Sequence, residues 1–278
     1  MRKMKITADS SANVLSLDGI PFAAAPLKIL AGEQEFVDHE ALDLDAMVAW
    51  FDGYKGKSKT SCPNPSDWLE AFGDGEDVFC VTITSGLSGS YNSACVAKQM
   101  YEAEHPDRRV CVIDSLSAGP ELVLTIEKLA EYIRQGMPYE EICRNILAYR
   151  EKTGLLFMLE SLKNFAANGR VSPALAKLCG VLGIRIIGKA SDQGTLEPTN
   201  KCRGESRSLS AIVTNLKEAG LSAGKVRIAH CMNAPAAQKL KEMILSQFGQ
   251  LDISIQACRG LCSYYAEKGG LLVGYEKL

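Results

Sequence analysis

The sequence predicts an α/β protein of two domains, and two features of its patterning support that prediction. In the first half, short apolar runs alternate with amphipathic stretches of helical length, which is typical of a parallel sheet with helices on both faces. Past Thr153, strands that form a hairpin are mixed with helices. We therefore expect a Rossmann-like domain over residues 1–159 and an α+β domain over residues 160–278.

In the first half, apolar runs mark the strands, and capping residues with apolar faces mark the helices. The first strand, Lys5–Ala8, ends at Asp9-Ser10-Ser11, on the sheet edge where open α/β proteins bind ligands. This segment is either a capping turn or a ligand contact, and we favour the cap. The other expected elements are strands Pro26–Leu30, Gln34–Asp38, Val78–Thr84 and Val110–Ile113, and helices Asp43–Gly53, Ser66–Phe72, Tyr91 to His105, Glu121–Gln135 and Tyr139–Lys152.

In the second half, the clearest local signal is the turn Asp192-Gln193-Gly194 between two short strands, which predicts a hairpin. A proline in the first turn favours a helix over Pro173–Leu182. The other expected elements are strands Leu155–Leu159, Ile184–Lys189, Thr195–Pro198, Val226–His230, Asp252–Ala257 and Leu271–Tyr275, a helical turn over Leu162–Ala167, and helices Ser208–Ala219 and Ala234–Phe248.

The composition is that of an ordinary globular protein and excludes several classes. Of the 278 residues, 46% are hydrophobic and 23% charged, and the net charge of −2 offers no basic field for nucleic acid. The apolar runs are too short to span a membrane, and the N-terminal residues lack the apolar core of a signal peptide. We expect a cytoplasmic protein that is not integral to a membrane.

The ten cysteines predict neither disulfides nor a metal site. Several, such as Cys80 and Cys111, lie within apolar segments, where a free thiol behaves as a small hydrophobe. There is no CxxC pair, and Cys258 and Cys262 have neither a second pair nor a neighbouring histidine to complete a zinc site. Reduced thiols in a reducing compartment are the expectation.

The stretch from Val78 to Met100 combines a strand, a turn of glycines and serines, and a helix. The first N–H groups of such a helix have no partner within it and carry partial positive charge. With serine hydroxyls beside them and glycines that admit a ligand, they could bind a carboxylate or phosphate. The alternative is an ordinary strand-to-helix turn, and this stretch alone does not decide between the two.

A second polar stretch, Lys59–Pro65, contains two prolines and predicts a fixed loop without regular structure. It presents the hydroxyls of Thr60 and Ser61 just before a helix. By itself it is most simply a capping loop.

Among catalytic chemistries, a serine hydrolase is the one with some support. The segment around Ser88 approaches the nucleophile motif G-x-S-x-G but has serine in place of the last glycine. A triad also needs a histidine, and the chain has only His39, His105 and His230, of which His230 alone follows a strand. Neither a P-loop nor a dinucleotide fingerprint is present.

The remaining possibility is binding without chemistry. The two hydroxyl-rich segments, Thr60-Ser61 and Ser85–Ser90, together with Arg170 in a glycine break, could hold one carboxylate. An apolar cavity between the two domains could then hold the tail of the same ligand.

These motifs, in their order and spacing, resemble those of the DegV family of bacterial fatty-acid-binding proteins over nearly the whole chain. The most specific match is Thr84 to Tyr91, which is similar to the family's Ser-Ser-Gly-x-Ser-Gly-Thr-Tyr turn. The other matching segments are Asp9-Ser10-Ser11, Thr60-Ser61-Cys62-Pro63, Asp114-Ser115, Leu162 to Val171 with its Gly169-Arg170, and Arg203 to Arg207.

The resemblance implies a carrier that is not itself catalytic, needs no cofactor and buries a long-chain fatty acid in a tunnel between its domains. It implies Thr60 and Ser88 as hydroxyl donors to the carboxylate, with Ser61, Ser85 and Gly86 nearby. It also implies a fatty acid kinase as partner in phospholipid metabolism, with at most transient membrane contact. A surface containing Arg203 and Arg207 resembles the region that docks the kinase.

One departure from the family concerns Tyr265, which occupies the position of a histidine that usually contacts the carboxylate. A phenol can donate a hydrogen bond but carries no positive charge at neutral pH. We therefore expect a more neutral head-group site if Tyr265 faces the ligand. The alternative is that Tyr264 and Tyr265 are packed in the core.

Overall fold

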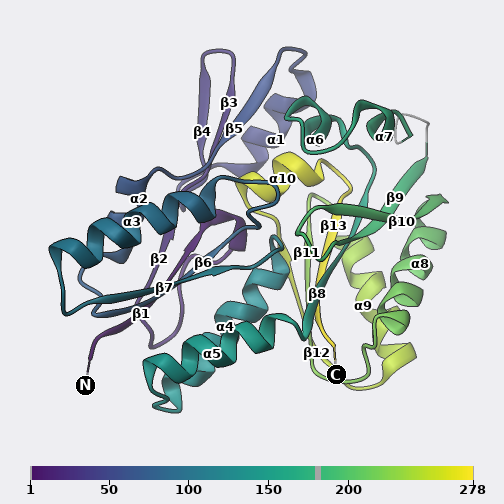
Figure 1. Cartoon of the computed structure of the whole chain (residues 1–278). Coiled ribbons are helices and arrows are strands. Elements are labelled where there is room, and N and C mark those ends of the chain that lie inside the picture. Colours follow the sequence, from purple (N-terminus) through teal and green to yellow (C-terminus); the bar gives the residue numbers. More distant parts are fainter. Residues whose placement is uncertain (1, 179–182, 278) are drawn as a thin grey trace.

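The computed structural model describes residues 2–178 and 183–277 and contains two main sheets (Figure 1). The first sheet is parallel, with strand order β2-β1-β6-β7. Its apolar faces are covered by α2 and α3 on one side and by α4 and α5 on the other. These elements are β1 (Met4–Asp9), β2 (Phe22–Ala25), α2 (Pro65–Phe72), β6 (Asp77–Thr82), α3 (Ser90–Glu104), β7 (Arg109–Asp114), α4 (Pro120–Arg134) and α5 (Tyr139–Arg150).

The second sheet is mixed, with order β10-β9-β8-β13-β11-β12, and only its β11–β12 pair is parallel. Helices α8 and α9 pack their leucines and isoleucines on one face of it. The members are β8 (Thr153–Leu159), β9 (Ile184–Ala190), β10 (Leu196–Arg203), α8 (Glu205–Glu218), β11 (Lys225–His230), α9 (Ala234–Phe248), β12 (Asp252–Ala257) and β13 (Leu271–Glu276).

A small antiparallel sheet, β4-β3-β5, connects the two halves of the molecule. It comes from the first quarter of the chain, yet it packs with α1 (Leu44–Gly53) against α10 (Gly260–Ala266) near the C-terminus. Its strands are β3 (Lys28–Ala31), β4 (Gln34–Val37) and β5 (Ser58–Ser61). Figure 1 shows this sheet and α1 on the same side of the molecule as α10 and α6 (Lys163–Ala167).

The parallel first sheet and the mixed second sheet confirm the predicted fold class, and the hairpin of β9 and β10 lies where it was expected. The strand β8, just ahead of the predicted boundary at residue 160, pairs within the second sheet. The chain therefore passes from the first sheet to the second between α5 and β8. The predicted helix over Pro173–Leu182 is present as α7 (Pro173–Leu178), and residues 179–182 lie outside the described part of the chain.

One local prediction needs correction, and two elements were not expected. The segment Lys59–Pro65 is not entirely without regular structure, because its first residues form β5 and pair with β3. The prolines at positions 63 and 65 lie beyond the paired residues, so they remove no hydrogen bond from the strand. Helix α10 was not expected at all, and neither was the short strand β2.

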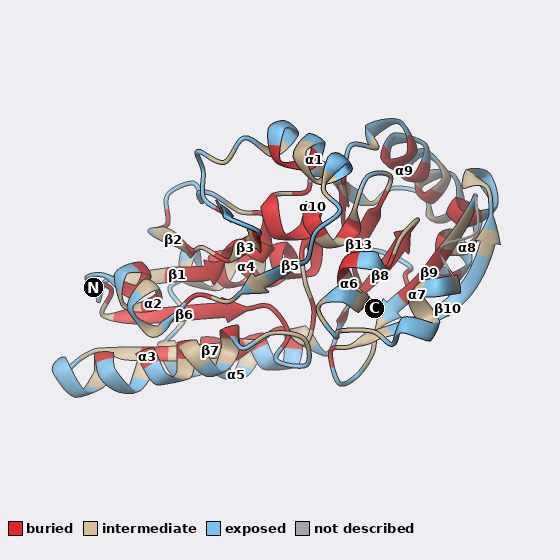
Figure 2. Ribbon diagram, turned by 90° about the horizontal axis from the view of Figure 1, so that it is seen from above, coloured by how far each residue is buried: buried red, intermediate tan, exposed pale blue. Residues whose placement is uncertain are grey.

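Burial follows this layered arrangement. Figure 2 shows most strands of the two main sheets buried, whereas the strand β10 and the outer faces of the helices are exposed. The other edge strand of the second sheet, β12, is also mostly not buried. Among the described residues, no helix combines the length and the apolar character needed to cross a bilayer.

Candidate functional site

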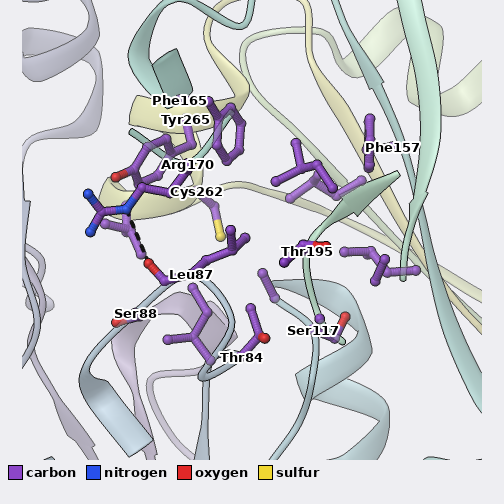
Figure 3. Close-up of a pocket in the computed structure, with 18 of the residues that line it drawn as sticks. Thr84, Leu87, Ser88, Ser117, Phe157, Phe165, Arg170, Thr195, Cys262 and Tyr265 are labelled. Atoms are coloured by element: carbon purple, nitrogen blue, oxygen red, sulfur yellow. Dashed lines mark hydrogen bonds between the residues drawn. The ribbon is translucent and has the colours of Figure 1, made fainter. Parts of the chain in front are cut away.

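A cavity of about 310 Å³ lies between the two main sheets, roofed by the small sheet and α10. Its volume is at the lower end of the range of about 300–1,000 Å³ that is usual for small-molecule pockets. Thr60, Ser88 and Tyr265 gather at one end, and apolar side chains form most of the remaining wall. The lining also includes the polar residues Thr84, Ser117, Lys189 and Thr195. Figure 3 shows the two ends, with Ser88, Arg170 and Tyr265 on one side and Phe157 on the other.

The polar end brings together hydroxyls from three distant parts of the chain. Thr60 comes from β5, Ser88 from the turn before α3, and Tyr265 from α10, and all three line the cavity. The Thr60 and Tyr265 hydroxyl oxygens are 2.8 Å apart, within hydrogen-bond distance. The Ser88 hydroxyl oxygen accepts the backbone N–H of Ser90 at 3.2 Å, so its own proton is available to a ligand.

A buried carboxylate beneath this end fixes the turn between β6 and α3. Asp9 accepts the backbone N–H of Ile83 at 2.8 Å and the hydroxyl of Ser90 at 2.6 Å. It also accepts the backbone N–H of Ser11, as the N-cap of a short 3₁₀ helix over Ser10–Ala12. Burial raises the pKa of the Asp9 carboxyl. The capping interpretation of this segment is therefore confirmed.

Two residues predicted near the carboxylate lie off the cavity wall. Ser85 is exposed, and its backbone N–H donates to Asp114 at 3.1 Å. Gly86 packs so closely on the β9–β10 hairpin that a Cβ atom there would lie 2.4 Å from the Gln193 carbonyl oxygen. These positions shape the turn that carries Ser88 rather than face the cavity.

Arg170 and Ser61 line the cavity, but the structure already uses several of their donors. Arg170 Nε donates to the Leu87 carbonyl at 3.1 Å (dashed in Figure 3), and its Nη1 donates to the Asn168 carbonyl. The guanidinium is thus hydrogen-bonded to the turn next to Ser88. Ser61 is exposed, and its hydroxyl donates to the Cys62 carbonyl at 3.3 Å. Direct carboxylate contacts by these two residues remain predictions.

The sequence left open whether Tyr265 faces the cavity or both tyrosines of α10 pack in the core. In the structure, one of them lies in the core and the other on the cavity wall. Tyr264 is buried in the core, where its hydroxyl contacts Ser58 and Asn168. Tyr265 lies on the cavity wall, and its ring packs on Phe165 with centroids 4.6 Å apart. Burial raises the pKa of the Tyr265 phenol, which keeps it neutral at physiological pH.

The other end of the cavity is mostly apolar, with Ser117 and Thr195 as polar exceptions (Figure 3). Alternate residues of β8, namely Leu155, Phe157 and Leu159, point into it. The Phe157 ring covers Gly188 of the neighbouring strand, where a Cβ atom would lie only 2.3 Å from the ring. The remaining apolar side chains on the wall include Leu27, Ile83, Leu87, Ala118, Phe165, Leu196, Leu261 and Leu272.

The structure gives no support to a catalytic serine at this site. None of the three histidines lines the cavity, and His230 Nδ1 accepts the backbone N–H of Asn233 at 3.3 Å. Ser88 therefore has no base of the kind that a triad needs. Within residues 2–178 and 183–277 there is also no cluster of side chains that could hold a metal ion.

The two arginines predicted for docking lie outside the cavity. Arg203 ends β10 and Arg207 lies in the first turns of α8, and both are exposed. One polar residue that the sequence did not single out is Asn168, whose side chain bonds to β5, α6 and α10. Its place in the glycine break before Arg170 is the one sequence signal that could have marked it.

These features define a class: α/β proteins whose two sheets enclose a mostly apolar cavity with a hydroxyl-rich end. The model of the DegV family, described as a family of uncharacterised proteins, matches residues 3–277. A DegV domain-containing protein of Streptococcus pneumoniae is 45% identical over 276 residues, 98% of each chain. The chain therefore belongs to the DegV family.

Two solved structures superimpose closely, each with a TM-score of 0.97. One is a DegV family protein from Eubacterium eligens loaded with heptadecanoic acid; it is 44% identical, and the match covers 99% of this chain and 100% of that one. The other is the Fatty Acid Kinase (Fak) B3 protein of Streptococcus pneumoniae loaded with linoleic acid; it is 45% identical, with 99% of each chain covered.

Proposed function

We propose that this protein binds a long-chain fatty acid in the cavity between its sheets and presents the carboxylate to a fatty acid kinase, which forms the acyl phosphate. The observation that carries the proposal is the cavity itself, with a hydroxyl-rich end and a mostly apolar wall beyond it. Relatives of 44% and 45% identity, with the same fold, were solved with such acids bound.

The apolar tail supplies most of the affinity in this proposal. Burial of about fifteen methylenes at ~0.8 kcal/mol each gives roughly 12 kcal/mol before losses. Immobilising the ligand takes back several kcal/mol of that gain. The hydroxyl groups therefore contribute mainly orientation, by holding the carboxylate at one end of the cavity.

The proposed head-group site consists of Thr60, Ser88 and Tyr265, with Ser61 and Arg170 at its edge. Most donors in this site are neutral hydroxyls. Arg170 is charged, but two of its nitrogens already donate to backbone carbonyls. Ser85 and Gly86 support the turn from outside the wall. A carboxylate that accepts two or three such bonds stays ionised without a cation in contact.

The kinase partner is proposed to dock on the face that presents Arg203 and Arg207, since both side chains are exposed and separate from the cavity. In this role the protein is a carrier without a cofactor, and catalysis belongs to the kinase. A cytoplasmic location completes the proposal and fits the nine described cysteines, all of which are free thiols.

Mass spectrometry of gently extracted, purified protein tests the proposal directly. We expect a co-purified long-chain acid, at about one per chain. A serine-reactive fluorophosphonate provides the control, since a carrier should remain unlabelled at Ser88. Labelling of Ser88, together with the absence of a co-purified acid, would contradict the carrier function and favour a hydrolase.

The kinase step needs its own test. The double variant Arg203→Glu/Arg207→Glu should bind the acid as the unmodified protein does but yield much less acyl phosphate with a fatty acid kinase. The control is Lys217→Glu, which also replaces a cation by a carboxylate but lies in the last turn of α8. If the unmodified protein, the double variant and the control gave equal yields of acyl phosphate, this face would not be the docking surface.

A further inference from the structure

A second set of hydroxyl-bearing side chains lines the cavity apart from the head-group residues. It consists of Thr84, Ser117 and Thr195, which we call the second hydroxyl cluster. Thr84 follows β6, Ser117 precedes α4, and Thr195 immediately precedes β10 in the hairpin. The Thr84 backbone N–H donates to the Ser117 carbonyl at 2.8 Å. Figure 3 shows Ser117 and Thr195 on the side of the cavity away from Ser88, so the cluster faces the chain of a bound acid and not its carboxylate.

The Ser117 hydroxyl is the unusual member of this cluster. The residue is only 2% exposed, and its side-chain oxygen has no hydrogen-bond partner among residues 2–178 and 183–277. Buried hydroxyls are nearly always paired, because an unpaired one has lost its bonds to water without replacement. An unpaired hydroxyl on the wall of a ligand cavity therefore points to a polar atom of the ligand as its partner.

The carboxyl of Glu121, in the first turn of α4, is the competing partner within the protein. Burial raises the pKa of this carboxyl, and the nearby hydroxyls of Ser117 and Thr153 lower it. Of these two hydroxyls, only that of Thr153 is placed to form a hydrogen bond with Glu121, at 2.7 Å. The bonding capacity of Ser117 is therefore not used by Glu121.

The backbone of Ser117 is fixed, whereas its side chain can turn. Its N–H donates to the Ser115 hydroxyl oxygen at 3.0 Å, and its carbonyl accepts the Ser115 hydroxyl at 3.1 Å as well as the Thr84 N–H. The preceding Leu116 has a φ of 53°, a left-handed conformation that is uncommon for leucine. Only rotation about χ1 remains, so the hydroxyl can turn among three staggered positions to meet a ligand atom.

We propose that the second hydroxyl cluster is a subsite for an oxygen carried on the acyl chain, and that the preferred ligand is a long-chain fatty acid with a secondary hydroxyl away from its carboxylate. A plain hydrocarbon chain offers Ser117 no partner, whereas a secondary alcohol both donates and accepts. The start of α4 at Pro120 also favours an oxygen nearby, because a helix N-terminus carries partial positive charge. This inference rests on the proposed function, since it narrows the class of acid bound.

Competition binding tests the proposal with a plain fatty acid and its monohydroxy derivatives, in which the hydroxyl occupies successive positions along the chain. We expect one or two neighbouring positions to bind at least as tightly as the plain acid. The other positions should bind about tenfold more weakly, because their hydroxyl is buried without a partner. If the protein binds none of these acids, the proposed function fails. If it binds the plain acid but every hydroxy acid more weakly, or all positions equally, the function stands and the subsite is wrong.

Ser117→Ala removes the hydroxyl and keeps the backbone bonds of this residue. It should weaken the preferred hydroxy acid about tenfold, change the plain acid by less than about twofold, and abolish any preference between the two enantiomers of the hydroxy acid. The matched control, Ser88→Ala, makes the same change at the head-group end and should weaken both acids alike. Equal effects of Ser117→Ala on the two acids, or a lower melting temperature with unchanged selectivity, would assign the hydroxyl to the fold through Glu121 and overturn the proposal.

Discussion

The two ends of the cavity are built by different means. The polar end depends on a strand of the small sheet, a turn, and the unpredicted helix α10, joined by hydrogen bonds such as that between Thr60 and Tyr265, 205 positions apart. The apolar end is formed largely by strands of the second sheet, chiefly β8, whose side chains alternate between the two faces of that sheet. The polar end fixes the directions of hydrogen bonds, whereas the apolar side chains of the other end fix only the volume that a ligand can occupy.

This difference predicts different responses to substitution. At the apolar end, a change should alter how much of a ligand fits and should act on acids and alcohols equally. At the polar end, a change should distinguish one head group from another and leave the tail contribution intact. The following predictions test that separation, beginning with the largest expected effect.

Ala118→Trp should abolish useful binding. Ala118 is half-buried on the cavity wall, so an indole there would occupy space needed by the tail. Losing about four methylenes of burial, at ~0.8 kcal/mol each, costs roughly 3 kcal/mol, or more than 100-fold in affinity. Isothermal titration with a fatty acid and with its alcohol should show equal losses. Val96→Trp, on the exposed face of α3, is the control and should bind normally.

Ser88→Ala should weaken the acid by about tenfold and leave the alcohol nearly unchanged, because the Ser88 proton is free to reach a carboxylate. The same titration measures it, with acyl-phosphate formation by a fatty acid kinase as a second readout. If the acid, the alcohol and the acyl-phosphate yield were all unaffected, Ser88 would not belong to the head-group site.

Phe157→Leu should shift the preferred chain length upward, since a shorter side chain at the apolar end leaves more room for the terminal methyl group. The preference for an acid longer by two carbons should rise by roughly threefold, within the usual value of one or two buried methylenes. Competition between acids of graded length measures this shift. A preference that moved toward shorter acids would show that the tail ends elsewhere.

The last prediction concerns the pH dependence of stability and not ligand affinity, and it involves the contact that holds the start of α10. Asp38 accepts the backbone N–H groups of Gly260 and Leu261 at the start of α10, at 3.0 and 2.9 Å. Burial raises the pKa of its carboxyl, so the folded state holds the proton more tightly than the unfolded state. The free energy of unfolding should therefore rise as pH falls from neutral toward the ordinary Asp value of 3.8.

Asp38→Asn should reduce this dependence and cost about 1–3 kcal/mol at neutral pH, since one amide oxygen replaces two acceptors. Urea denaturation at pH 5 and pH 7 compares the two proteins. A variant whose stability changes with pH as steeply as that of the unmodified protein would show that the Asp38 proton is not involved.

Local patterns were sufficient to predict most strands and helices, because apolar periodicity is a property of short segments. The turn that carries Ser88 was predicted for the same reason. Helix α10 was not, since Gly260 and the serine and cysteine that follow favour a helix only weakly. Its first N–H groups are held by Asp38, 222 positions away, and no local pattern records such a partner.

The pairing of Thr60 with Tyr265 could not be predicted for a similar reason. The sequence suggested both residues, but their contact depends on the small sheet packing against α10. The two prolines in Lys59–Pro65 were given too much weight, because they lie just past the paired residues of β5. Asn168 was overlooked because its three partners belong to three different elements.

Because the roof of the cavity joins β3 and β5 to α10, the pocket is complete only when nearly the whole chain is present. Leu27 and Thr60 precede Tyr265 and Leu272 by more than 200 positions, yet all four line one cavity. During synthesis the cavity therefore cannot close until the residues of α10 and β13 have joined the chain. A fragment that ends before α10 would lack part of the cavity wall.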